Sequence, residues 1–107
     1  MHGIGTYTWP LTGDRYIGEF REGLRHGKGE YIFGNHELVS GSIGCKYSGD
    51  WKDNMRHGRG IFTWKDGSIY DGDWEGNKRH GRGELYIASS GFRYIGNWEN
   101  NKMVNKF

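Results

Sequence analysis

The residues of this chain that could do chemistry recur at regular intervals. Four histidines each precede a glycine, at His2, His26, His57 and His80, and a single cysteine stands at position 45. Imidazole and thiolate groups are common metal ligands and catalytic groups. If each histidine falls on a separate β-hairpin, neighbouring histidines lie two strand spacings apart, about 9–10 Å, too far for one metal ion to bridge them. We therefore interpret the histidines as structural and expect no metal site.

Other catalytic arrangements find little support. Cys45 has no partner at a fixed spacing, so a Cys–His nucleophile is not indicated. The sequence Gly27-Lys28-Gly29 lacks the upstream glycine and the following Ser or Thr of a phosphate-binding loop. No pair of carboxylates falls outside the repeating pattern described next. We expect a protein that is not an enzyme and needs no cofactor.

The elements that must position these residues belong to an internal repeat. Residues 16–29, 47–60 and 70–83 all read Tyr-x-Gly-x-Trp/Phe followed by Arg-His-Gly-x-Gly. Successive tyrosines lie 31, 23 and 24 positions apart (47−16, 70−47, 94−70). A period in the low twenties indicates a repeat architecture. The chain opens on the second half of the unit and closes on the first, so both a piece of a longer array and a natural start remain open.

This period divides the chain into a single array. We expect a half repeat over residues 1–15, full repeats over 16–46, 47–69 and 70–93, and a half repeat over 94–107. The first full repeat is longer than its neighbour by eight (31 against 23). Residues 34–46 carry the extra length, as an extended hairpin or a protruding loop. Such a loop either contacts a partner or is a tolerated surface insertion.

The local pattern is that of β-strands. Apolar residues and glycines alternate with polar residues at period 2, for example in residues 2–9 and 58–64. Each repeat therefore predicts a hairpin closed by a six-residue loop, which is residues 21–26 in the first copy. No segment shows a helical period. The prediction is an all-β protein, a twisted single-layered antiparallel β-meander of at least eight strands with little or no helix.

The hairpins also suggest a register. If Trp51 lies opposite Gly58, then Gly49 faces Gly60 and Tyr47 faces Phe62. An aromatic ring over a glycine recovers part of the packing that glycine lacks. The opposite face of the sheet would then carry three acid–base pairs, between the residues Glu19–Lys28, Asp50–Arg59 and Asp73–Arg82.

Composition narrows the classes of function. The 107 residues are 34% hydrophobic and 16% aromatic, with a net charge of +2, which is too small to argue for nucleic acid binding. A lone cysteine excludes an internal disulfide and favours a reducing compartment. The sequence has no apolar run of 18 residues and shows no signal peptide at its N-terminus.

These motifs resemble the MORN (membrane occupation and recognition nexus) repeat over nearly the whole chain. The last copy departs from the motif, because Val104 and Asn105 stand where His-Gly is expected; the array ends there in a cap-like variant, or this unit is imperfect. The resemblance implies a β-meander with an aromatic concave face. It also implies a scaffolding role in a eukaryotic cell, as in ciliary radial spokes, motor adaptors, and junction or cytoskeletal proteins.

Two functions follow as expectations. The first is a cytoplasmic scaffold, in a cytoskeletal or axonemal assembly, that grips a helix, an extended segment or a neighbouring array. The second is a peripheral module that binds acidic phospholipid weakly through Arg25, Arg56 and Arg79. The expected partner-binding residues are Tyr16, Phe20, Tyr47, Trp51, Tyr70, Trp74, Tyr94 and Trp98. The expected structural residues are Gly27, Gly29, Gly58, Gly60, Gly81, Gly83, His26, His57 and His80.

Overall fold

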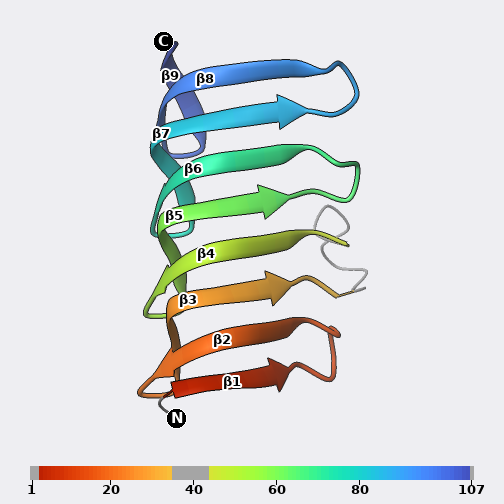
Figure 1. The fold of residues 1–107 in the computed structure, drawn as a ribbon, viewed down its shortest axis with the longest axis vertical. Helices are drawn as coiled ribbons and strands as arrows, with labels where there is room; N and C mark the ends of the chain where they lie inside the picture. The colour runs from red at the N-terminus through yellow and green to blue at the C-terminus, as the bar shows by residue number, and fades with distance from the viewer. Residues whose placement is uncertain (1–2, 35–43, 107) are drawn as a thin grey trace.

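Nine antiparallel strands pair in chain order in the computed structural model, which describes residues 3–34 and 44–106 (Figure 1). Each strand is hydrogen-bonded only to its sequence neighbours, from β1 at one edge of the sheet to β9 at the other. The strands are β1 (Gly3–Thr8), β2 (Arg15–Arg21), β3 (Leu24–Ile32), β4 (Lys46–Lys52), β5 (Met55–Thr63), β6 (Ile69–Glu75), β7 (Lys78–Ile87), β8 (Phe92–Glu99) and β9 (Lys102–Lys106). The predicted all-β meander is confirmed.

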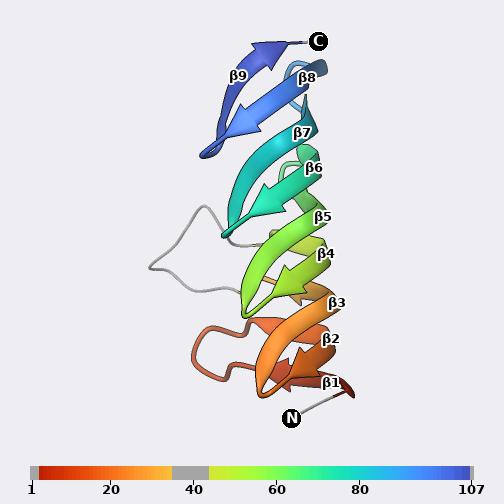
Figure 2. The same ribbon diagram turned by 90° about the vertical axis from the view of Figure 1, so that its left-hand side faces the viewer.

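The sheet is a single open layer that bends into a trough. In side view the strands curve instead of running straight (Figure 2). The described residues contain no helix, and thus none that is long and apolar enough to cross a membrane. Three tyrosines, Tyr16, Tyr47 and Tyr70, nevertheless have no exposed surface. Complete burial in a one-layer sheet requires that the sheet itself bend around these rings, so the aromatic face is the inner side of the trough.

Tight turns connect the strands at one edge of the trough. The connections β2–β3, β4–β5, β6–β7 and β8–β9 each have two residues, and the predicted six-residue loop is wrong. In every one of these turns both central residues have positive φ, as in Asp53 (48°) and Asn54 (70°). This is the signature of the type I′ turn, whose twist matches that of the flanking strands. Asp-Asn and Gly-Asn pairs at the centre of the turns are the sequence signal for it.

A bulge beside each tight turn alters part of the predicted register. Gly49 faces Gly60 and Tyr47 faces Phe62, as predicted. Trp51, however, faces Arg56, because three residues of β5 lie opposite the single residue Asp50 of β4. Gly58 instead faces Trp74 of the following hairpin. The left-handed backbone of Gly58 (φ 65°) lies within this bulge, where glycine is the residue that adopts it without strain.

The core is one continuous stack of rings. Each buried tyrosine packs edge-on against two rings, one from its own hairpin and one from the next. The Tyr47 ring lies 5.1 Å from that of Trp51 and 5.3 Å from that of Trp74, both T-shaped. The three buried tryptophans also reach back to the preceding hairpin, where for example Trp74 Nε1 donates a hydrogen bond to Gly60 O at 3.1 Å. The core therefore joins successive hairpins instead of filling each one separately.

Candidate functional site: the aromatic face

The tyrosines predicted to contact a partner form the floor of the aromatic face. Tyr16, Tyr47 and Tyr70 are fully buried, and their hydroxyls donate to backbone carbonyls at 2.8–3.0 Å. Burial raises the pKa of Tyr16 and of Tyr70 to about 12. These hydroxyls are not offered to a ligand, because a carbonyl three residues on in the chain already accepts the hydrogen bond. Tyr94 is half-buried.

The second row of predicted residues is almost as enclosed. Phe20, Trp51, Trp74 and Trp98 are 9%, 6%, 5% and 6% exposed. Their edges pack between the tyrosines, and the three indole N–H groups donate to Gly29, Gly60 and Gly83 carbonyls. These rings therefore shape the trough, and a ligand would reach only a small part of their surface.

A third set of side chains, four aromatic and one leucine, is more accessible and was missed as a candidate site. These side chains are half-buried and pack against the core from the strand ends near the longer connections. The sequence pattern places them on the aromatic face, but it gives no reason to rank them above the repeated tyrosines. The set comprises Trp9, Tyr31, Phe33, Trp64 and Leu85.

Hollows lie along this accessible row. The largest, about 490 Å³, lies beside β1 and is lined by Tyr7, Trp9, Phe20 and Tyr31, among others. A hollow of about 200 Å³ follows near Phe33, and one of about 260 Å³ lies between Trp64 and Leu85, further along the sheet. The aromatic face is thus a trough with open sites between its rings.

Three arginines connect successive hairpins across this trough. The Arg56 guanidinium stacks 4.7 Å from the Trp74 ring centre and donates from Nη2 to the Asn77 carbonyl at 2.9 Å. The Arg56 backbone N–H donates to Asn77 Oδ1 at 2.8 Å. The pairs Arg25–Asn54 and Arg79–Asn101 repeat this arrangement. We call each Arg–Asn pair a clasp. Burial lowers the pKa of Arg56 and of Arg79, since it penalises the charged form.

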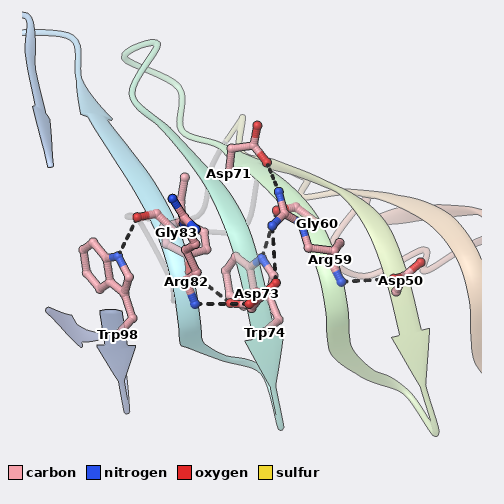
Figure 3. A network of polar contacts seen from close by, with 10 residues as sticks. Asp50, Arg59, Gly60, Asp71, Asp73, Trp74, Arg82, Gly83 and Trp98 are labelled. Atoms are coloured by element: carbon pink, nitrogen blue, oxygen red, sulfur yellow. Dashed lines mark hydrogen bonds and ion pairs between the residues drawn. The ribbon is translucent and has the colours of Figure 1, made fainter. Parts of the chain in front are cut away.

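The opposite, charged face carries a ladder of alternating acids and bases. Figure 3 shows its central part, in which the Arg59 guanidinium lies 3.5 Å from both Asp71 and Asp73. The predicted side-chain pair Asp50–Arg59 is not formed. Asp50 accepts from the Arg59 backbone N–H at 3.0 Å and pairs with Lys28 of the preceding hairpin. These contacts keep the pKa of Asp50 below its ordinary value against the opposing effect of its partial burial.

Glu19 and Asp73 accept the same kind of backbone hydrogen bond as Asp50. Glu19 accepts from the Lys28 backbone N–H at 2.5 Å, and Asp73 accepts from the Arg82 backbone N–H at 3.1 Å. Each acid therefore caps the bulge of its own hairpin with a backbone bond. The bases Lys28 and Arg59 reach acids of the next hairpin. The charged face, like the core, connects one hairpin to the next.

The repeated histidines lie beside the tight turns. His26 Nδ1 is 4.0 Å from an Asp53 oxygen, and His80 Nε2 is 3.3 Å from a Glu75 oxygen. Among residues 3–34 and 44–106, no three His, Cys, Asp or Glu side chains gather closely enough to hold a metal ion. Cys45 is buried at 1% exposure. His2 and most of the expected loop at 34–46 lie outside the described residues.

Comparison with known proteins gives one family. The MORN repeat matches residues 1–10, 16–37, 47–69, 70–92 and 94–106. No curated protein matches the chain.

Proposed function

Since this chain belongs to the MORN repeat family, we propose that it is a non-catalytic scaffold that holds a protein partner in its aromatic trough. The observation that carries the proposal is the row of half-exposed rings around the hollows of that face. Aromatic side chains that stay partly exposed beside a packed core are typical of protein interfaces.

The two faces of the sheet differ in what they offer a partner. On the charged face the acids and bases already bond to one another or to the backbone, so a partner would have to displace these contacts. On the aromatic face, Trp9, Tyr31, Phe33 and Trp64 keep surface that a ligand can cover. A partner that covers them removes apolar area from water, at roughly 25 cal/mol per Å².

The motif residues have a supporting part in this proposal. We assign the direct contacts mainly to the accessible row, with the exposed edges of Phe20, Trp51, Trp74 and Trp98 and the half-buried Tyr94 alongside them. Tyr16, Tyr47 and Tyr70 then support the surface from beneath, and Gly29, Gly60 and Gly83 leave room for their rings.

Subtype and location rest on family resemblance alone. We propose a cytoplasmic site in a cytoskeletal or axonemal assembly, of the radial-spoke or motor-adaptor kind. The proposed array keeps the division into half repeats at 1–15 and 94–107 around the three full ones.

The lipid alternative has less support. Its basic edge was expected at Arg25, Arg56 and Arg79, but these side chains stack on rings and bond to asparagines inside the trough. Acidic residues such as Asp53 and Glu75 lie at or beside the turn tips. A membrane surface carrying negative charge would meet these acids first.

The test compares two half-buried aromatics on opposite faces. Trp64→Ala alters the aromatic face, and Tyr86→Ala alters the charged face, where the Arg93 guanidinium lies 5.0 Å from the ring. Proteins captured from cell extract by the unaltered chain should be lost with Trp64→Ala and retained with Tyr86→Ala, with both variants folded by circular dichroism. Flotation with anionic vesicles runs in parallel. Loss with Tyr86→Ala only, or binding to vesicles only, would overturn the proposal.

A further inference from the structure

We infer that the partner segment is an acidic amphipathic helix whose carboxylates, about two turns apart, meet Arg25, Arg56 and Arg79 in the trough. This inference rests on the proposed function and adds the chemistry of the partner. It is carried by a row of cations on the aromatic face that no carboxylate of the described chain neutralises.

The three arginines bond only to neutral groups. Their side chains donate to asparagine oxygens, Arg25 also contacts the neutral Tyr31 hydroxyl, and all three guanidiniums face aromatic rings. None of them is in an ion pair within residues 3–34 and 44–106, whereas Lys28, Lys46, Arg59 and Arg93 all are. Among the described residues that line the three aromatic hollows, Asp66 is the single carboxylate, and it accepts from the Ser68 backbone N–H at 2.9 Å.

The guanidiniums have donors to spare and open onto the hollows. A guanidinium has five N–H donors; towards the asparagines Arg25 and Arg79 each use one side-chain donor and Arg56 uses two, and Arg25 also contacts the Tyr31 hydroxyl. Arg25 Nε is buried without an acceptor. Arg25 lines two of the hollows, Arg56 one and Arg79 one. An anionic group entering the trough would therefore find an oriented guanidinium, which binds carboxylate with paired hydrogen bonds.

The spacing of the arginines selects the ligand. Each arginine is on the return strand of its hairpin, so neighbours are two strands apart, about 9–10 Å. Residues seven apart on a helix rise by about 10.5 Å and lie on the same side. A helix running along the trough can thus present one carboxylate to each arginine.

A helix also forms the hydrogen bonds of its own backbone groups, which a segment bound in the trough must do. A segment in the trough crosses the strands and lies on side chains, away from the free backbone groups of the sheet edges. An extended chain there would leave its own N–H and C=O groups without partners from the sheet. A helix bonds these groups internally and lays its apolar side against Tyr31, Phe33 and Trp64.

The test uses a designed probe, because it leaves the protein unaltered. The probe is a helical peptide of about 21 residues, with leucines on one side and three glutamates spaced seven apart beside them. A first control peptide replaces the glutamates by glutamines, and a second moves them to the far side of the helix. We expect the probe to bind about tenfold or more tightly than either control at low salt, and to weaken as salt rises.

Variants of the protein separate this inference from the proposed function. Arg56→Gln should reduce the preference for the glutamate probe, and Trp64→Ala should weaken the probe and the glutamine control alike. If glutamate and glutamine peptides bind equally and Trp64→Ala weakens both, the trough binds protein but the acidic partner is wrong. If Trp64→Ala changes neither, the proposed function fails as well. Full titrations with both peptides give the ratio of their Kd values, which partial unfolding of Arg56→Gln does not change because it lowers only the number of binding sites. The melting temperature of this variant is measured alongside.

Discussion

Each of the three buried motif tyrosines forms a matched pair with a glycine of its own hairpin. A Cβ built on Gly60 would overlap the Tyr47 hydroxyl and the ring carbon that bears it, and Gly29 and Gly83 are in the same position under Tyr16 and Tyr70. The glycine, which has no side chain, thus leaves the space that the tyrosine ring fills. The tyrosine hydroxyl donates a hydrogen bond to a backbone carbonyl, which fixes the ring against the sheet.

Gly60→Ala should therefore destabilise the fold strongly, although it adds only one methyl group. The obstructing atoms belong to a fully buried ring, which has no free space into which to move. We expect a loss of roughly 2–3 kcal/mol in the free energy of unfolding, measured by urea denaturation. Gly67→Ala is the control, since its Cβ would meet only Ala88 at 3.7 Å; its positive φ predicts a loss of about 1 kcal/mol. Equal losses at the two sites would contradict the pairing of Tyr47 with Gly60.

The same tyrosines predict a decline in stability at alkaline pH. The pKa of Tyr16, Tyr31 and Tyr70 is raised by burial to about 12, against about 10 in an unfolded chain. Above pH 10 the unfolded state binds fewer protons than the folded state, so the free energy of unfolding falls as pH rises. This stabilising contribution is complete below about pH 10 and is lost as pH rises through about 12. Urea midpoints across this range should fall less steeply in Tyr70→Phe, and an identical slope would contradict the assignment.

At the scale of the elements, the clasp sets how one hairpin meets the next. Three of the four tight turns place an asparagine in left-handed conformation, where its side chain and backbone reach the arginine of the preceding hairpin. The first full hairpin has Gly23 at this position, so its turn offers no side chain to form a clasp. The same turn backbone therefore occurs with and without the clasp.

This difference provides a matched pair of substitutions. Asn77→Gly keeps the positive φ (70°) but removes the acceptor for the Arg56 N–H and Nε groups, so we expect a loss of about 1–2 kcal/mol in the free energy of unfolding. Gly23→Asn adds a side chain in open space at the same turn position and should change stability by less than about 0.5 kcal/mol. Thermal and urea unfolding of both variants tests this. A comparable change in the free energy of unfolding at the two positions would show that the turn backbone, and not the clasp, determines the stability.

The period-2 pattern predicted the strands, their order and the pairs Gly49–Gly60 and Tyr47–Phe62 correctly, because these depend only on alternation along the strands. The predicted partners of Trp51 and Arg59 were wrong. A bulge changes which residues face each other across two strands, and the alternating sequence pattern gives no sign of it. It also assigned contact residues by repetition. Tyr47 recurs because the core needs it, whereas Trp64 remains accessible because of its place near a strand end, which only the bend of the sheet reveals.

At the scale of the whole molecule, the contacts that stabilise the fold join only neighbouring hairpins along the array. Every strand bonds only to the strands beside it, and the rings, clasps and charge ladder all link neighbours. A one-dimensional array of this kind depends on interfaces between adjacent units. A central hairpin has two such interfaces, while β1 and β9 each have one bonded neighbour.

Hydrogen exchange should therefore be graded along the chain. We expect the slowest amides in β4 to β7 and the fastest among the strands in β1 and β9, since opening an end strand breaks one interface and opening a central one breaks two. Exchange measured by NMR or mass spectrometry checks this. Uniform protection from β1 to β9 would mean that the array unfolds only as a whole.

The connection between β3 and β4 is eight residues longer than the corresponding one in the next repeat, yet the pairing across it is unchanged. Gly27 faces Trp51 just as Gly58 faces Trp74 and Gly81 faces Trp98. All three clasps lie at the tight-turn edge, so they do not depend on the length of the long connection. In evolutionary terms, we expect the two edges to tolerate change separately. New sequence can be acquired at the long-loop edge, and with it a second binding specificity, while the inherited trough is passed on intact.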